Sequence, residues 1–322
     1  MLETEFEVLK LLNENSSVSQ RMISKMVGVS LGKANSLIKE LVNKNYIIKQ
    51  IGEGGIDYKV TSEGMKVLKE NIHKAKMLRI NIHEDFDFEV KEAVILAAGK
   101  RSDFDIPVSL LDIGDITLID RTINILKNNG IEKIVIISGY KNELFDSLKA
   151  KYSNIHIVVN DNYVNTGTMA SVVSAKDVIE NDFILIESDL IFEERAISEL
   201  KKNSNRDCIL LSKVSGSNDE AFVEIRDGYL FKIAKDIHQL NSIHGEVVGI
   251  TKISYKLFNL MLEEYNRNTN PYINYEYTLL DVARNYNVGY IRIDDLIWGE
   301  IDTIEQYDKM INITYPKILT VK

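Results

Sequence analysis

The 322-residue sequence predicts an α/β protein with a mixed, mainly parallel sheet, preceded by a small domain of helices and one β-hairpin. Two patterns support this prediction. From residue 92 onward, short apolar runs alternate with helical patterns, which is typical of a parallel sheet flanked by helices. Before residue 75, helical patterns precede two short strands that a glycine-rich turn joins. The length also suits two domains better than one.

The composition predicts a cytoplasmic globular protein. Hydrophobic residues make up 45% of the chain and charged residues 27%. The one cysteine, Cys208, cannot form an internal disulfide, the first residues do not resemble a signal peptide, and no apolar run is long enough to span a membrane. Residues 1–80 carry a net charge of +4 and the remainder −13, which favours partners of two different kinds.

The first 75 residues predict four helices and a hairpin. A capping box at Thr4–Glu7 starts the first helix, and the second covers Ser19–Met26 with Met22, Ile23 and Met26 facing inward. Ser30 begins a third, over residues 31–43, which buries Ala34, Leu37, Ile38 and Leu41. Strands at 46–50 and 56–60 follow, then a closing helix from Thr61.

This order of elements resembles the MarR-like and related winged helix-turn-helix regulators. The resemblance implies that the third helix enters a major groove of DNA, with Ser30, Lys33, Asn35 and Ser36 near bases or phosphates. The alternative is that its charged residues form a solvated face and that the module serves dimerisation or domain packing, so a homodimer is one expectation. We expect this domain to cover residues 1–75, a linker 76–91, and the α/β domain 92–322.

The α/β domain places its informative residues directly after its apolar runs. Predicted buried strands cover 93–98, 134–137, 155–159 and 183–186, with helices starting at Thr117 and covering 170–178. Ligands of such Rossmann-like sheets bind at the carboxyl ends of the strands. The candidates there are Gly99-Lys100-Arg101, Gly139-Tyr140 and Ser188-Asp189. A turn of small residues at Ala98-Gly99 would let backbone N–H groups approach a phosphate, and Lys100 and Arg101 would neutralise triphosphate charge.

A series of segments then carries a resemblance to a known family. They are VILAAG (94–99), PVSLLDIG (107–114), LIDRTINILKNNGIEKIVIISGY (118–140), NTGTM (165–169), ESDLIFE (187–193), SGSNDEAFVE (215–224), IAKDI (233–237), GEVVGITKIS (245–254), YEYTLLDVA (275–283) and WGEID (298–302). In order and spacing they resemble the nucleotidyltransferases that activate sugar phosphates, and most closely the cytidylyltransferases for phosphocholine and 2-aminoethylphosphonate. The resemblance implies the nucleotidyltransferase fold and transfer of CMP from CTP to a small phosphate or phosphonate, with release of pyrophosphate.

The resemblance also assigns roles to single residues. Asp189 and Asp302 match the metal-binding aspartates, which implies Mg²⁺ as cofactor. Lys235 matches the lysine that contacts the acceptor phosphate and joins Lys100 and Arg101 as a catalytic candidate. The nucleotide-binding candidates are Leu96, Ala97, Ala98, Gly99, Gly139, Tyr140, Asn165, Thr166, Gly167 and Thr168. Candidates to surround a cationic head group are Asp219, Glu220, Glu246, Tyr275, Glu276 and Trp298.

One departure from the family pattern leaves alternatives open. The family loop has a second glycine and a Pro-Lys pair whose lysine contacts phosphate, whereas this chain has Pro107-Val108. Either Lys100 and Arg101 supply the missing charge or the active site is weakened. In the second case the α/β domain would sense a nucleotide or metabolite, and the N-terminal domain would act on DNA as a transcriptional regulator.

Overall fold

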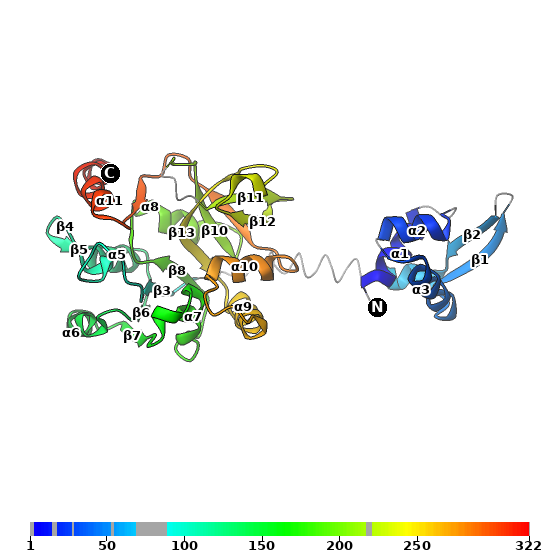
Figure 1. Ribbon diagram of the computed structural model, residues 1–322, viewed down its shortest axis with the longest axis horizontal. Helices are drawn as coiled ribbons and strands as arrows, with labels where there is room; N and C mark the ends of the chain where they lie inside the picture. The colour runs from blue at the N-terminus through cyan, green and yellow to red at the C-terminus, as the bar shows by residue number, and fades with distance from the viewer. Residues whose placement is uncertain are drawn as a thin grey trace. The chain divides into compact units, whose positions relative to one another are not determined.

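The computed structural model describes residues 3–14, 18–27, 29–52, 55–68, 89–216 and 221–321 (Figure 1). The chain divides into two units, Met1–Glu84 and Asp85–Lys322. Among the described residues no helix has the length and apolar character needed to cross a membrane.

The first unit is a winged-helix arrangement. Its elements are α1 (Glu3–Glu14), α2 (Gln20–Val27), α3 (Leu31–Asn43), β1 (Ile47–Gly52) and β2 (Gly55–Val60), and residues 62–68 are also helical. Ser30 caps α3 by accepting a hydrogen bond from the N–H of Lys33 (3.2 Å). The predicted inward face of α3 is confirmed, since all four of its apolar residues are fully buried.

One prediction in this unit is wrong, and others lie outside the described residues. Met22 is 50% exposed, whereas Ile23 is fully buried as predicted. Helix α1 begins at Glu3, and the side chains of Thr4 and Glu7 in the predicted capping box are not described. The buried Glu5 pairs with Lys44 across the domain (2.5 Å). The side chain of Met26, the hairpin tip at 53–54 and residues 69–88, which hold most of the expected linker, are not described.

The second unit is built on a mixed sheet with nine strands among the described residues. The strand order is β12-β11-β13-β8-β3-β6-β7, and β10 pairs with β13 and β14. The central strands β8, β3, β6 and β7 are parallel, whereas β13 is antiparallel to β8. The bounds are β3 (Glu92–Ala97), β6 (Lys133–Ser138), β7 (Ile155–Val159), β8 (Phe183–Glu187), β10 (Cys208–Ser212), β11 (Phe222–Arg226), β12 (Tyr229–Ala234), β13 (Gly245–Ile253) and β14 (Gly289–Arg292).

Helices cover both faces of this sheet. The central strand β3 shows the division, because Ala93, Ile95 and Ala97 join one core cluster and Val94, Leu96 and Ala98 the other. The first cluster packs under α5 (Leu118–Asn128), α6 (Asp146–Lys151) and α8 (Arg195–Lys202), and the second under α7 (Thr168–Ser174), α9 (Tyr255–Arg267) and α10 (Tyr275–Ala283). Helix α7 ends earlier than the predicted helix over 170–178.

A smaller cluster lies beside the carboxyl end of β8. There β9 (Leu190–Phe192) pairs with β15 (Trp298–Glu300), and β4 (Asp112–Ile113) with β5 (Ile116–Thr117). The chain closes with α11 (Ile304–Lys309), the π-helix η5 (Met310–Thr314) and α12 (Tyr315–Thr320). Phe104, Val108, Ile113, Leu118, Ile191, Ile301, Met310 and Ile318 form the buried part of this cluster. The packing of Ile191 and Ile301 in this cluster fixes the two segments that carry Asp189 and Asp302.

Candidate active site

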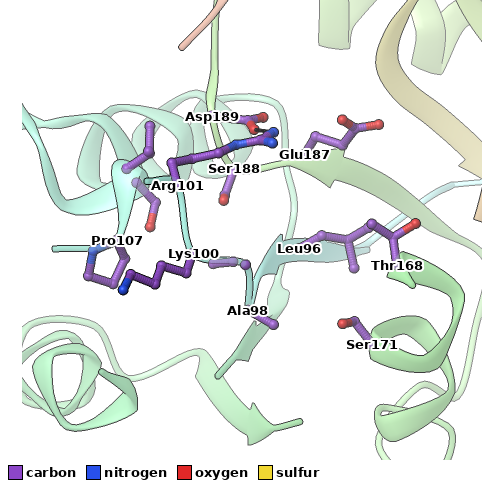
Figure 2. Close-up of a pocket in the computed structure, with 14 residues that line it drawn as sticks. Leu96, Ala98, Lys100, Arg101, Pro107, Thr168, Ser171, Glu187, Ser188 and Asp189 are labelled. Carbon is purple, nitrogen blue, oxygen red and sulfur yellow. Dashed lines mark hydrogen bonds and ion pairs between the residues drawn. The ribbon is translucent and has the colours of Figure 1, made fainter. Parts of the chain in front are cut away.

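A cavity opens at the carboxyl ends of β3 and β8. The two strands run parallel with Leu96 opposite Glu187, and the Ser188 N–H donates to the Leu96 carbonyl (3.2 Å), so both chain segments leave the sheet side by side. Figure 2 shows the side chains around this first cavity. Its lining consists of Leu96, Ala97, Ala98, Gly99, Lys100, Arg101, Pro107, Val108, Ser109, Thr168, Ser171, Glu187, Ser188 and Asp189.

A second cavity adjoins the first. Arg101, Thr168 and Glu187 line both of them, so the two form neighbouring parts of one cleft. The rest of the second lining is mostly polar: Ala221, Lys235, Glu246, Val247, Val248, Gly249, Asn274, Glu276, Trp298, Glu300 and Asp302. The cleft therefore has room for two ligands with a boundary between them.

Asp189 and Asp302 converge at this boundary. They follow β8 and β15, and the Ile301 N–H donates to the Asp189 carbonyl (3.0 Å), which holds the two segments together. Asp189 lines the first cavity and Asp302 the second. Nη2 of Arg101 lies 2.7 Å from Asp189 Oδ2 and 2.6 Å from Asp302 Oδ1. The two carboxylates, 113 positions apart in sequence, thus share one cationic nitrogen.

This pair has the character of a site for a hard divalent cation. Oδ1 of Asp189 is buried and accepts no hydrogen bond from the part of the chain that is described. A buried carboxylate oxygen without a partner is costly, and a cation would remove that cost. No group of three or more His, Cys, Asp or Glu arranged around a metal position occurs among the described residues. Mg²⁺ usually binds one or two carboxylates and keeps several water ligands, so two carboxylates suit it better than they suit a metal whose ligands all come from the protein.

Buried acidic groups gather beside this boundary, and their burial favours the neutral form of each carboxyl. Burial raises the pKa of the Glu187 carboxyl well above its usual value, and the charges of Glu276 and Asp189 raise it further. Burial likewise raises the pKa of Glu276. Tyr275 is fully buried and donates its hydroxyl to Glu187 Oε1 (2.9 Å), so it supports the cavity from below. The chain thus keeps carboxyl groups out of water where a cationic ligand could meet them.

The sequence reasoning did not select Glu187 and Glu300 as site residues. A signal for both was present: each stands two positions before a predicted metal ligand on an extended segment, and residues two apart in a strand point to the same face. Ser109 and Ser171 were also missed, and both line the first cavity. The Ser109 hydroxyl is buried without a hydrogen-bond partner among the described residues.

The basic candidates line the cleft at different points. Lys100 and Arg101 line the first cavity and extend in different directions, Arg101 toward Asp189 and Lys100 toward Pro107 (Figure 2). Lys235 follows β12 and lines the second cavity, where its charge lowers the pKa of Glu276. Val108 is 6% exposed and packs in the small cluster beside β9 and β15. Val108, which stands where the family has a lysine, thus contributes to packing. The positive charge in the lining of the first cavity comes from Lys100 and Arg101.

The loops predicted to bind the nucleotide surround the turn after β3 and the boundary. The Tyr140 N–H donates to the Ala98 carbonyl (3.0 Å), and a side chain at Gly139 would meet that carbonyl at 2.8 Å. In the segment 165–168 only Thr168 lines the cavities, while Asn165 and Thr166 bond to Asn162. The Gly167 N–H donates to the Pro271 carbonyl (2.8 Å), which ties this loop to the segment between α9 and α10.

The head-group candidates divide into three groups. Glu246, Glu276 and Trp298 line the second cavity, and the buried Glu246 accepts hydrogen bonds from the N–H and hydroxyl of Ser215. Tyr275 lies beneath the lining. Asp219 and Glu220 lie outside the described residues.

In the first unit the DNA-binding candidates lie at the start of α3. Lys33 and Ser36 are exposed, Asn35 is half-buried, and the Ser30 hydroxyl is engaged in the helix cap. These positions leave the amino-terminal half of α3 available for contact on its outer face.

Comparison with known families identifies both parts of the chain. Residues 1–48 match the winged helix-turn-helix DNA-binding family, and residues 93–242 match the MobA-like NTP transferase domain. The chain carries a MobA-like NTP transferase domain behind a winged helix-turn-helix. The predicted fold class is confirmed.

Several relatives of the transferase domain are cytidylyltransferases by name. The choline-phosphate cytidylyltransferase of Haemophilus influenzae is 28% identical over 236 residues, 70% of this chain and 97% of that protein. The 2-aminoethylphosphonate cytidylyltransferase of Lancefieldella rimae is 28% identical over 154 residues, 46% of this chain and 62% of that protein. The CTP:phosphoglutamine cytidylyltransferase of Campylobacter jejuni is 23% identical over 194 residues, 54% and 77% of the respective chains.

The transferase domain also resembles solved structures in fold. The CTP:phosphocholine cytidylyltransferase of Streptococcus pneumoniae superimposes with a TM-score of 0.59 at 24% identity, over 70% of this chain and 99% of that one. This likeness shows the fold. The match of residues 93–242 to the NTP transferase domain, with the relatives above, identifies the second unit as a nucleotidyltransferase by family.

Proposed function

We propose that this nucleotidyltransferase is a cytidylyltransferase, which transfers CMP from CTP to a small phosphate or phosphonate acceptor and releases pyrophosphate. The convergence of Asp189 and Asp302 at the boundary between two cavities is the observation that supports this most strongly. Nucleotidyl transfer needs a nucleotide and an acceptor on either side of one reacting phosphorus, with a cation beside it. The preference for CTP and the class of acceptor come from the relatives.

The reaction joins two anions, so the protein acts mainly by neutralising charge and positioning groups. An acceptor oxygen forms a bond to the α-phosphorus of CTP while the bond from that phosphorus to the bridging oxygen of pyrophosphate breaks. Asp189 and Asp302 would hold Mg²⁺, which lowers the charge repulsion between the phosphates when it is bound. Lys100 and Arg101 would contact the triphosphate, and Lys235 the acceptor phosphate. The turn after β3, the loops at 139–140 and 165–168 and the rest of the first cavity would position the nucleotide.

The second cavity favours an acceptor that carries a cationic group as well as a phosphate or phosphonate. Glu187, Glu246, Glu276 and Glu300 line it together with Trp298. Oε2 of Glu276 is buried and accepts no hydrogen bond from a described residue, so an ammonium N–H would satisfy it. A primary ammonium can donate that bond, whereas a trimethylammonium has no N–H. We therefore place aminoethyl acceptors ahead of choline esters.

Pyrophosphate release with Mg²⁺ tests this function. The purified full chain is incubated with CTP, UTP, ATP or GTP and with phosphocholine, phosphoethanolamine, 2-aminoethylphosphonate or phosphoglutamine. We expect release with CTP and an amine-bearing acceptor, and formation of the CMP-linked product by mass spectrometry. A folded sample that binds CTP but releases no pyrophosphate with any acceptor would contradict the proposal.

A second candidate function is transcriptional regulation by the winged helix. It is favoured by the match of residues 1–48 to DNA-binding domains and by exposed Lys33 and Ser36 on α3. It predicts binding to the DNA upstream of its own coding sequence, with an affinity that falls as salt rises, and a change on adding CTP or the acceptor. Replacing Lys33 with Gln should lower the salt slope by about one, and the exposed Lys66→Gln serves as control in the same domain. Binding that is absent or independent of salt would exclude this role.

A further inference from the structure

Arg101 occupies the place between the two metal-binding candidates. Its Nη2 atom lies within 2.7 Å of Asp189 Oδ2 and 2.6 Å of Asp302 Oδ1. Oδ1 of Asp189, which has no hydrogen-bond partner among the described residues, belongs to the same carboxylate, so a cation shared by the two aspartates would lie close to the guanidinium. Because a guanidinium and a divalent cation repel each other, Arg101 opposes the binding of a cation between the two carboxylates. Withdrawal of its side chain removes this opposition.

The surroundings of Arg101 allow it to withdraw. Its side chain is 46% exposed and belongs to the loop after β3, at the edge where the first cavity meets the second. The triphosphate of a nucleotide in the first cavity would lie on the same side as Lys100, whose ammonium stands 5.3 Å from the Tyr140 ring centre. A short rotation of the Arg101 side chain would move its guanidinium from the two carboxylates to the phosphate oxygens.

We propose that Arg101 is a displaceable counter-ion that reserves the Asp189–Asp302 pair for a cation arriving with a nucleotide. This inference rests on the proposed metal site. When cation and triphosphate bind together, the carboxylates gain the cation and the guanidinium gains phosphate, so each charged group keeps an opposite partner. A cation that binds alone leaves the guanidinium without an anionic partner beside a second positive charge, which is unfavourable. Arg101 thus couples cation binding to nucleotide binding, as a positioning residue that acts through the two aspartates.

A counter-ion role and a purely structural role of Arg101 predict opposite changes in cation affinity. Removing the guanidinium should increase the affinity for a divalent cation in the absence of nucleotide, because the competitor for the carboxylates is gone. A side chain needed only to hold the loop would instead weaken cation binding when it is removed. The sign of the change therefore separates the two roles.

Mn²⁺ is the probe, with the free ion measured by electron paramagnetic resonance in the presence of the full chain and no nucleotide. We expect Arg101→Gln to bind Mn²⁺ roughly tenfold tighter than the unaltered protein, within the 5–150-fold range of typical site couplings. Lys100→Gln removes a positive charge from the neighbouring position without touching the aspartates and should leave the affinity nearly unchanged. Adding Asp189→Asn to Arg101→Gln should abolish the gain, which assigns the bound ion to this pair.

Thermal melting verifies that each variant is folded, and Arg101→Ala provides a second route if the glutamine variant is not. The inference is wrong if folded Arg101 variants bind Mn²⁺ no tighter than the parent, if Lys100→Gln gains as much, or if no variant binds Mn²⁺ at all. Because this experiment uses neither nucleotide nor acceptor, a failure of the cytidylyltransferase assay leaves its result intact. The two proposals can therefore fail separately.

Discussion

The environment of Asp189 decides its chemistry more than its residue type does. One oxygen pairs with Arg101, and the other is buried with no partner among the described residues. In the interior of a stable protein such an oxygen is normally satisfied, because the loss of hydration is costly. The arrangement is stable here because the hydrogen bond from Ile301 to the Asp189 carbonyl and the packing of Ile191 and Ile301 fix the backbone around it.

Asp189→Asn tests whether that carboxylate charge serves catalysis. The amide keeps the shape of the side chain but not the charge that would hold Mg²⁺, so we expect pyrophosphate release to fall by at least about 10²-fold, the usual effect of removing one electrostatic group from a reacting centre. The melting temperature should change little, because the amide loses the ion pair with the partly exposed Arg101 but no longer buries a charged oxygen without a partner. The exposed Asp308→Asn is the control. A fully active Asp189→Asn protein would refute the metal assignment.

Glu276→Gln tests the acceptor pocket. Loss of a buried carboxylate that receives an ammonium should lower kcat/KM for an amine-bearing acceptor by about tenfold or more, since hydrogen bonds to charged groups contribute about 1.5–3 kcal/mol. The affinity for CTP should change little, because Glu276 lines only the second cavity. The exposed Glu305→Gln is the matched control. An equal loss of kcat/KM with an acceptor that has no amine would show that Glu276 does not bind the cationic group of the acceptor.

At the scale of elements, strand β13 bends to admit Glu187. Gly249 has φ +79°, and a side chain there would stand 3.1 Å from Glu187 Cδ and 3.0 Å from Leu190 Cδ1. The register of β10 against β13 shifts at this level, as expected for a β-bulge. The glycine therefore provides both the left-handed backbone and the space for a buried carboxyl group in the cleft.

Gly249→Ala should destabilise the transferase domain by about 1–3 kcal/mol, the range for a strained backbone conformation at a non-glycine residue. Gly228→Ala is the matched control, because its φ is +84° and nothing lies within 4 Å of the added carbon. The additional loss in free energy of unfolding for Gly249→Ala, relative to Gly228→Ala, then measures the effect of the close approach of Glu187. Denaturant unfolding followed by the fluorescence of Trp298, the single tryptophan, reports on this domain. Equal costs for the two variants would contradict the close-approach argument.

The sequence predicted the parallel core of the sheet better than its antiparallel edges. Apolar runs such as those of β3 and β6 are unambiguous because they are buried on both faces. The carboxyl ends of β3 and β8 then located Gly99, Arg101 and Asp189.

The bulge at Gly249, the pairing of β9 with β15 and the ion pairs of Arg101 depend on contacts between distant segments, and no local pattern records them. Met22 was predicted to face inward together with Ile23, but it is half-exposed, because the packing around α2 and not the local pattern decides which residues are buried.

At the scale of the whole molecule, the chain combines two units with separate cores. The buried cluster of the first unit includes Val8, Ile23 and Leu41, whereas those of the second are built around its sheet and the β9–β15 pair. Every described residue that lines the two cavities belongs to the second unit. The basic first 80 residues and the acidic remainder of the sequence thus correspond to different units.

Deleting residues 1–75 tests how far the units depend on each other. Because the cleft and its supporting cores lie in the second unit, we expect residues 76–322 to fold and to release pyrophosphate within about twofold of the full chain, whereas DNA binding should be lost. Mass measurement of both proteins in solution separates the roles of the first unit: a full-length dimer that becomes a monomer on deletion would show that the winged helix holds two copies together. A folded, deleted protein without turnover would mean that the first unit completes the site, contrary to the lining residues.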